Sequence, residues 1–228
     1  TQDTPTNNFA RLSQVIYTPD ASFSNAGLKF TGPGAHKSSW ASLGFSSGKW
    51  YWEAKATSSG THKFTIGLDN VKNSSNHAMS SGQNLIIGYT PSGGYAAGDG
   101  IGWYDTTLRK NGSTVASSLD RIVSGNIMQV ACDADNGKIY FGKNGTWRVA
   151  NSTTFNSANH DTTFTTGETY YPGFSAESCS WECNFGDGYF GTTAVASANA
   201  DGNGFGLFEY AVPSGYYALC TKNINTYG

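Results

Sequence analysis

The paired acidic residues of the segment DADNGKIYFGKNGTW, residues 133–147, have the clearest potential for chemistry. Asp133 and Asp135 have the Asp-x-Asp spacing that opens an EF-hand calcium loop. That loop needs an oxygen ligand at its fifth position and a bidentate Glu at its twelfth, where this chain has Gly137 and Asn144. We therefore expect no calcium site, no other metal site and no bound cofactor.

The acidic residues and the histidines do not support hydrolytic chemistry. Glycoside hydrolysis needs two carboxyl groups about 5–9.5 Å apart, which on a strand means residues two or four positions apart on one face. None of the Glu residues belongs to a Glu-x-Asp-x-x-Glu strand, and the histidines lie in polar stretches. The residues are Glu53, Glu168, Glu177, Glu182 and Glu209, with His36, His62, His77 and His160. We expect a protein that is not an enzyme, and a glycan hydrolase is the remote alternative.

Four cysteines would allow two disulfides. Cys179 and Cys183 lie four positions apart, so on one strand they would face the same side at too great a distance for an easy bridge. Cys132 and Cys220 lie inside apolar runs. A zinc site would need Cys-x₂-Cys pairs or neighbouring His, and neither occurs. The expectation is four buried free thiols.

Large aromatic residues beside a Gly-rich loop are the best candidates for ligand binding. The stretch PSGGYAAGDGIG, residues 91–102, runs directly into Trp103 and Tyr104. Exposed aromatic rings stack on sugar rings and anchor protein interfaces, and adjacent polar side chains can hydrogen-bond to hydroxyl groups. The alternative is that Trp103 and Tyr104 close one edge of a sheet. The candidate ligand-binding residues are Tyr95, Trp103, Tyr104, Asp105, Arg109 and Asn111.

Strands must position these candidates, because side chains along much of the chain alternate with a period of two. In KWYWEAKAT, residues 49–57, Trp50 and Trp52 share one face and are expected in the core. Asn136-Gly137 and Asn144-Gly145 favour type I′ turns. They predict an antiparallel meander of residues 127–135, 138–143 and 146–150. Further strands are expected at 28–31, 39–45, 62–69, 84–90, 171–175, 178–185 and 216–221.

The composition indicates one all-β domain, residues 14–228, after an entry segment or linker at 1–13 and with an insertion near 191–204. The 228 residues include 29 Gly, 13% are charged and the net charge is −2. Nucleic acids and anionic lipids attract clustered Lys and Arg, so neither is an expected partner. No run approaches roughly 18 apolar residues, so no membrane insertion is expected. The first residue is not Met, and we expect a processed chain or part of a longer one.

Several stretches together resemble the SPRY domain family. SGKWYWEAK (47–55) is similar to its opening Gly-Lys-aromatic-Tyr-aromatic-Glu strand, and IMQVACDADNGKIYFGKNG (127–145) to its central block. YYPGFS (170–175) and CNFGDGYF (183–190) resemble its closing strands. The resemblance implies a concanavalin A-like jelly roll, a two-sheet antiparallel sandwich that binds partners without catalysis. The GDGYFGTTAVASANADGNG stretch departs from eukaryotic SPRY domains.

The two flanks of the chain resemble SPRY-like modules of tailed-phage structural proteins. The similar segments are DTPTNNFA (3–10) and VPSGYYALCTKNIN (212–225). This resemblance implies a virion protein, made in the host cytoplasm, in a tail fibre or appendage that recognises a host-surface glycan or protein. The alternative is a capsid or fibre decoration protein that binds other virion proteins. In either setting a homo-oligomer is expected.

Overall fold

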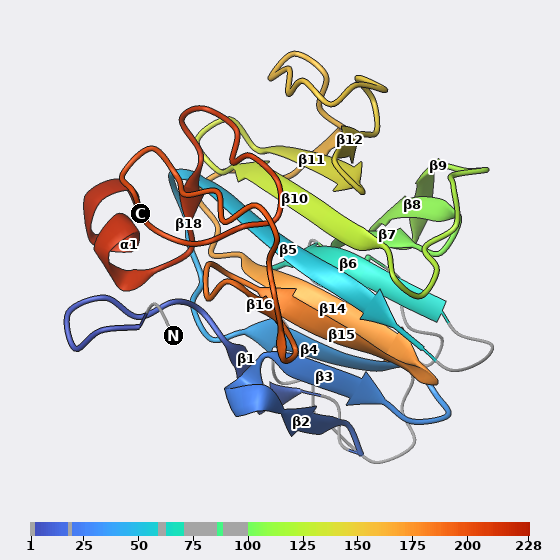
Figure 1. The fold of residues 1–228 in the computed structure, drawn as a ribbon. Helices are drawn as coiled ribbons and strands as arrows, with labels where there is room; N and C mark the ends of the chain where they lie inside the picture. The colour runs from blue at the N-terminus through green and yellow to red at the C-terminus, as the bar shows by residue number, and fades with distance from the viewer. Residues whose placement is uncertain (1–2, 18–19, 59–62, 71–85, 89–99) are drawn as a thin grey trace.

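Alternating side chains produce a sandwich of two antiparallel sheets in the computed structural model, which confirms the expected jelly-roll class (Figure 1). The structure describes residues 3–17, 20–58, 63–70, 86–88 and 100–228. The first sheet has seven strands in the described residues. In order across the sheet they are β1 (Leu12–Tyr17), β4 (Lys37–Ala41), β14 (Tyr171–Glu177), β6 (Lys63–Asp69), β7 (Ile101–Tyr104), β8 (Thr107–Lys110) and β9 (Ser113–Ala116).

The second sheet is built on β5, and its main path has seven strands. In order they are β12 (Thr146–Trp147), β11 (Lys138–Lys143), β10 (Ile127–Asp133), β5 (Lys49–Thr57), β15 (Cys179–Asn184), β3 (Lys29–Gly32) and β2 (Ser22–Ser24). Beside that path, β13 (Thr162–Thr163) pairs with β11, and β18 (Tyr217–Ala218) pairs in parallel with β5. The remaining elements are the hairpin of β16 (Tyr189–Phe190) and β17 (Thr193–Ala194), the short 3₁₀ turn η1 (Asn25–Gly27) and α1 (Thr221–Tyr227).

Aromatic side chains fill the space between the two sheets. Phe64 on β6 packs edge-to-face against Trp181 on β15 with ring centroids 5.0 Å apart. Trp50 and Trp52 are fully buried on β5, as the alternation predicts. Burying each such ring contributes on the order of 2–3 kcal/mol through the hydrophobic effect. The four cysteines are buried and unpaired, and Cys183 lies inside the layers.

A third layer covers the outer face of the β5 sheet. Tyr51 and Glu53 alternate with the core tryptophans and so point away from the first sheet, yet both are fully buried. Phe208 packs edge-to-face on Tyr51 at 5.0 Å. The Glu53 carboxylate accepts hydrogen bonds from the backbone N–H groups of Glu209 and Tyr210, both at 2.9 Å. The chain between about residues 199 and 216 therefore docks on β5 through an aromatic contact and a buried carboxylate.

The two Asn-Gly pairs of the meander form different turns. Asn144 and Gly145 both have positive φ, 50° and 83°, as a type I′ hairpin requires. At the other pair only Gly137 is left-handed, at 61°, so the type I′ prediction is wrong there. Residues 134–137 form a four-residue turn instead, because the Asp133 carboxylate accepts hydrogen bonds from the backbone and side chain of Asn136. Asp133 of the Asp-x-Asp pair thus builds the turn, while the Asp135 carboxylate accepts a hydrogen bond from the Gly48 N–H at 2.8 Å.

Most predicted strands are present, although several differ in extent. Strand β4 ends at Ala41 rather than at residue 45, and β12 ends at Trp147 rather than at residue 150. Residue 86 is in no strand, residues 87 and 88 form a turn, and the rest of the predicted 84–90 strand lies outside the described residues. The predicted 216–221 strand is reduced to β18, and the helix α1 follows it. The helix is held by a distant contact, since the buried Asn223 side chain donates a hydrogen bond to Asp201 at 2.8 Å.

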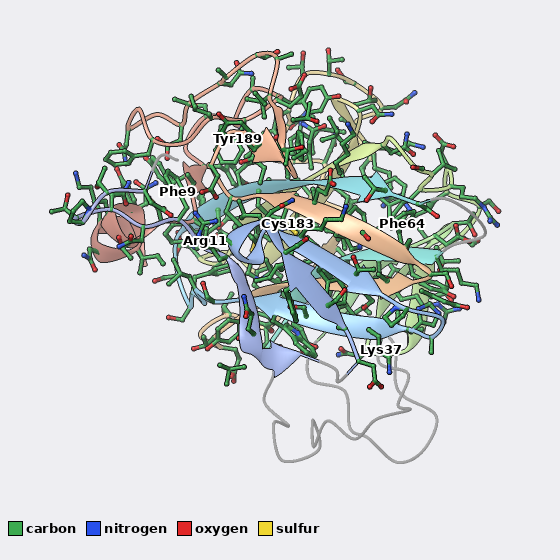
Figure 2. All side chains as sticks on the ribbon, turned by 60° about the horizontal axis from the view of Figure 1, so that its bottom comes forward. Phe9, Arg11, Lys37, Phe64, Cys183 and Tyr189 are labelled. Atoms are coloured by element: carbon green, nitrogen blue, oxygen red, sulfur yellow. The ribbon has the colours of Figure 1, made fainter. Side chains whose placement is uncertain are left out.

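The two end segments of the chain lie side by side. Phe9 forms an antiparallel bridge with Cys220, and the Ala10 N–H donates to the Leu219 carbonyl at 2.9 Å. Figures 1 and 2 show the N-terminal segment entering near α1, with Phe9 and Arg11 next to each other on it. Phe9, Ala10 and Leu12 are buried, so the segment expected to be an entry or linker packs against the sandwich.

Candidate functional site

The β7–β8 hairpin carries most of the predicted binding residues, and its pleat separates the two aromatic candidates. Trp103 points between the sheets, where it is 3% exposed and contacts Phe141 edge-to-face at 6.3 Å. Its indole N–H donates to the Asp105 carbonyl at 3.0 Å. The ring therefore helps to close the sandwich edge, and only a small part of it reaches the surface.

Tyr104 points to the opposite, outer face of the first sheet and joins a polar cluster there. Its ring centroid is 5.6 Å from that of His36, whose Nε2 is 2.7 Å from the Glu177 carboxylate. The Lys63 ammonium is 3.4 Å from the same carboxylate. Burial lowers the pKa of His36, against the opposing effect of Glu177. Tyr104 and Glu177 raise the pKa of Lys63.

The polar candidates that follow Tyr104 build turns. Asp105 has a positive φ of 50° in the β7–β8 turn, and its carboxylate is 3.2 Å from the Arg121 guanidinium. Asn111 has a φ of 49° at the tip of the β8–β9 hairpin. Arg109 donates to the Gly112 carbonyl at 3.2 Å and so braces that tip. Tyr95 lies outside the described residues. The structure therefore brings Trp103 and Asp105 to one edge, with Tyr104 on the outer face.

A pocket of about 390 Å³ opens beside Trp103, between β7 and the β11–β12 hairpin. Its apolar part comes from the rings of Trp103 and Trp147 and from Leu119. Both rings are almost completely buried, at 3% and 5% exposed. The size is within the range of roughly 300–1,000 Å³ that is usual for small-ligand sites. The polar lining consists of Asp120, Lys143, Asn144, Thr146, Arg148 and Asn151.

The two cations of this pocket are held by carboxylates. Lys143 pairs with Asp120 and donates to the Arg121 carbonyl at 3.2 Å. Arg148 pairs with Asp161, whose side chain is 1% exposed. Burial raises the pKa of Asp161, although Arg148 acts in the opposite direction. The pocket thus has a fixed aromatic floor and paired charges at its rim, which suits a ligand that is partly apolar and carries hydrogen-bonding groups.

One further sequence pattern has no catalytic surroundings in the structure. The segment GFSSG, residues 44–48, matches the Gly-x-Ser-x-Gly pattern of hydrolases, but it leads into β5 rather than into a helix, so it forms no nucleophile elbow. Within the described ranges, no cluster of three or more His, Cys, Asp or Glu side chains is placed to hold a metal ion. No helix among those residues is long and apolar enough to span a membrane.

Sequence reasoning missed most of this pocket. Lys143, Trp147 and Arg148 were expected only as parts of the meander, some forty residues after Trp103. Their side chains reach Trp103 because the two sheets close on each other at this edge. The one local signal is the Asn144-Gly145 turn, which places residues on both sides of it at the pocket rim.

Comparisons with known proteins agree with this architecture. A family model described as the SPRY domain matches residues 49–188. The SPRY domain of human HERC1 superposes with a TM-score of 0.53 at 16% identity, covering 75% of this chain and 96% of that chain. The TRIM65 PSpry domain gives a TM-score of 0.51 at 16% identity, covering 77% of this chain and 90% of that chain. At such identities the likeness shows the fold alone. No curated protein matches the chain significantly.

Proposed function

The chain belongs to the SPRY domain family, and on that premise we propose that it is a non-catalytic module that binds its partner at the pocket beside Trp103. SPRY domains are in general binding modules that mediate contacts between proteins. The partner that we propose is a host-surface protein or glycan.

The observation that carries this proposal is the combination of an aromatic floor with a polar rim. Trp103 and Trp147 line the pocket and offer a small apolar surface, 3% and 5% of each residue, to one apolar group of a partner. Aromatic side chains in such pockets are frequent anchors of interfaces and of sugar sites. The ion pairs Lys143–Asp120 and Arg148–Asp161 hold the rim in place before the partner arrives. A pre-ordered rim reduces the entropy that binding costs.

The setting that we propose is the virion of a tailed phage, in a tail fibre or appendage. The support is the resemblance of residues 3–10 and 212–225 to modules of phage structural proteins. Other virion proteins and further copies of this chain are then its neighbours. Single sites of this size would bind with a Kd of roughly 1 mM to 1 µM, and repeated copies in one particle would strengthen attachment through avidity.

Binding of fluorescent protein to a printed glycan array and to a panel of whole bacteria tests the proposal. The variant Asp120→Arg places a bulky cation at the rim, beside Lys143. It is expected to fold normally, because the Asp120 side chain is 81% exposed. The matched control is Asn225→Arg on α1, which is exposed and lies far from β12 in Figure 1. We expect binding by the wild type and the control, and at least about tenfold weaker binding by Asp120→Arg.

Two outcomes would count against this proposal. Equal binding by all three proteins would place the partner elsewhere on the surface. Absence of binding to every cell and glycan by a folded, monodisperse wild-type sample would favour the decoration role, in which the module contacts only other virion proteins.

A further inference from the structure

A second pocket, of about 480 Å³, opens at the start of β5 and shares no lining residue with the pocket beside Trp103. It lies between the first residue of β5, the loop at residues 154–157 and the turn that precedes β18. Its lining combines polar and aromatic side chains. The lining residues are Lys49, Thr154, Phe155, Asn156, Ser157, Ser214 and Tyr216.

The wall of this pocket contains the buried phenol of Tyr216, which is 2% exposed. Its hydroxyl has less than 1 Å² of accessible surface, so a ligand in the pocket does not reach it. Burial and the neighbouring Tyr140 raise the pKa of Tyr216. The Tyr140 hydroxyl donates to the Ser157 carbonyl at 2.9 Å and so helps to hold the loop at residues 154–157.

The aromatic wall is fixed in place by its neighbours. The Phe155 ring packs edge-to-face against Tyr216 at 5.1 Å and against Trp147 at 5.0 Å, and it is tilted on Tyr140 at 4.9 Å. Phe155 itself remains partly exposed and lines the pocket. The loop that carries it therefore presents an apolar surface that does not have to be ordered by the ligand.

The charges around the pocket balance, which decides the class of ligand. The Lys49 ammonium is 3.1 Å from the Asp133 carboxylate and 5.9 Å from the centroid of the Tyr216 ring. Because Lys49 is already paired, an anion would find no free positive charge, and a cation would meet the ammonium. The other polar groups are hydroxyls and an amide, which both donate and accept hydrogen bonds.

We propose that this pocket binds one neutral pyranose unit of a glycan, with the sugar packed against Phe155 and hydrogen-bonded to Lys49 and to the exposed polar groups of the wall. Sugar hydroxyls donate and accept in the same way as the Ser, Thr and Asn groups of the wall. The apolar face of a pyranose ring matches an exposed aromatic surface. The site shares no lining residue with the pocket beside Trp103, although Phe155 packs on Trp147 of that pocket, and it goes beyond the proposed function.

Titration of the ¹⁵N-labelled protein by NMR tests this site directly. The probes are methyl α-D-glucoside, methyl α-D-mannoside, methyl β-D-galactoside and N-acetylglucosamine, each added to about 100 mM. We expect saturable shifts of the amides of Ser157 and Ser214 with at least one sugar, with a Kd on the order of 1–10 mM. Such a Kd is usual for a single small ligand that makes few hydrogen bonds.

One variant and two controls separate a ligand role from a structural role. Tyr216→Phe removes only a hydroxyl that the ligand does not reach, so it is the first control and should bind like the wild type. Ser214→Arg fills the pocket from an exposed position and should abolish the shifts. Tyr217→Phe is the second control, since Tyr217 stacks on Tyr227 at 4.0 Å, and it should bind like the wild type.

Two results would overturn the proposal. The first is the absence of saturable shifts at these amides with all four sugars. The second is an unchanged Kd in Ser214→Arg. This variant does not touch the pocket beside Trp103, and Asp120→Arg leaves this pocket intact, so a failure here is distinct from a failure of the proposed function.

Discussion

The buried carboxyl group of Glu53 should make the stability of this protein depend on pH. Its two oxygens accept hydrogen bonds from the Tyr51 hydroxyl at 2.8 Å and from the backbone N–H groups of Glu209 and Tyr210. The Asn184 amide lies at 3.5 Å. These partners are all neutral, so the charge of an ionised Glu53 would be stabilised by dipoles alone.

The direction and size of the effect follow from the pKa of this carboxyl. Burial is the largest cause and raises the pKa of Glu53 from its ordinary value of 4.5 to about 7, against the lowering effect of the Tyr210 and Glu209 amides. Folding therefore favours the protonated carboxyl. That stabilisation is complete below the unfolded pKa and is lost as the pH rises through about 7. At 1.36 kcal/mol per pKa unit it amounts to roughly 3 kcal/mol, most of it lost between about pH 5 and pH 8.

Substitution of Glu53 by Gln isolates this contribution. The amide cannot titrate, and its NH₂ group must face one of the two backbone N–H donors, which costs about 1–3 kcal/mol. Urea unfolding from pH 5 to pH 8 gives the free energy of unfolding of both proteins. The wild type should be the more stable at pH 5, and its advantage should shrink by roughly 2–3 kcal/mol by pH 8. Other titrating groups, such as His36, are common to both proteins and cancel in the difference.

The control for this experiment is Asn225→Ala, an exposed residue of α1 that carries no titrating group. The difference between this control and the wild type should not vary with pH. If the difference between the wild type and Glu53→Gln were equally flat, Glu53 would be ionised at both ends of the range, and the reasoning from burial would be refuted.

Two further substitutions test how the layers and the ends are held. Gly67→Ala places a Cβ 1.9 Å from the Ile101 carbonyl oxygen on the neighbouring strand. Thermal unfolding should therefore show a free energy of unfolding that is lower by at least about 2 kcal/mol. The control Gly202→Ala should be tolerated, because the nearest atom to its new Cβ would be 3.9 Å away. Arg11→Met removes the partner that lies 2.7 Å from the Asp187 carboxylate, which is 1% exposed. The free energy of unfolding should fall by about 2–3 kcal/mol. In a double-mutant cycle, the double variant with Asp187→Asn should recover most of that stability.

The sequence predicts strands well where the alternation of apolar side chains coincides with their burial in the core. The bounds of β5 and β11 match the expectation residue for residue, because alternation and an adjoining turn signal both mark them. The outer face of β5 was not predictable in this way. Glu53 reads as a solvent-facing residue by alternation, and its cover comes from residues 208–210, more than 150 positions later. Local periodicity carries no information on such a distant contact.

The helix and the candidate site show the same limit. The helix α1 has no side-chain cap and only seven residues, so the local sequence predicts it weakly. Its stability comes instead from a tertiary contact, the hydrogen bond from Asn223 to Asp201. For the binding residues, the Gly-rich loop drew attention to the region of Trp103, where the structure has a pocket. The interpretation of its ring as exposed ignored the pleat, which turns Trp103 inward and Tyr104 outward. Most of the other pocket residues lie on or beside the β11–β12 hairpin, which is close to Trp103 only because the two sheets close on each other.

The antiparallel contact between the two end segments also determines how the domain responds to mechanical load. The bridge between Phe9 and Cys220 and the bond from Ala10 to Leu219 run side by side. Because the segments are antiparallel, tension applied at the two ends of the chain would load these bonds one after another, in the unzipping geometry. In the shear geometry all the bonds would be loaded at once. The end segments would therefore peel away at low force and lengthen the tether while the β5 sheet stayed intact. A module attached through these ends would yield at its attachment before it lost its binding surfaces.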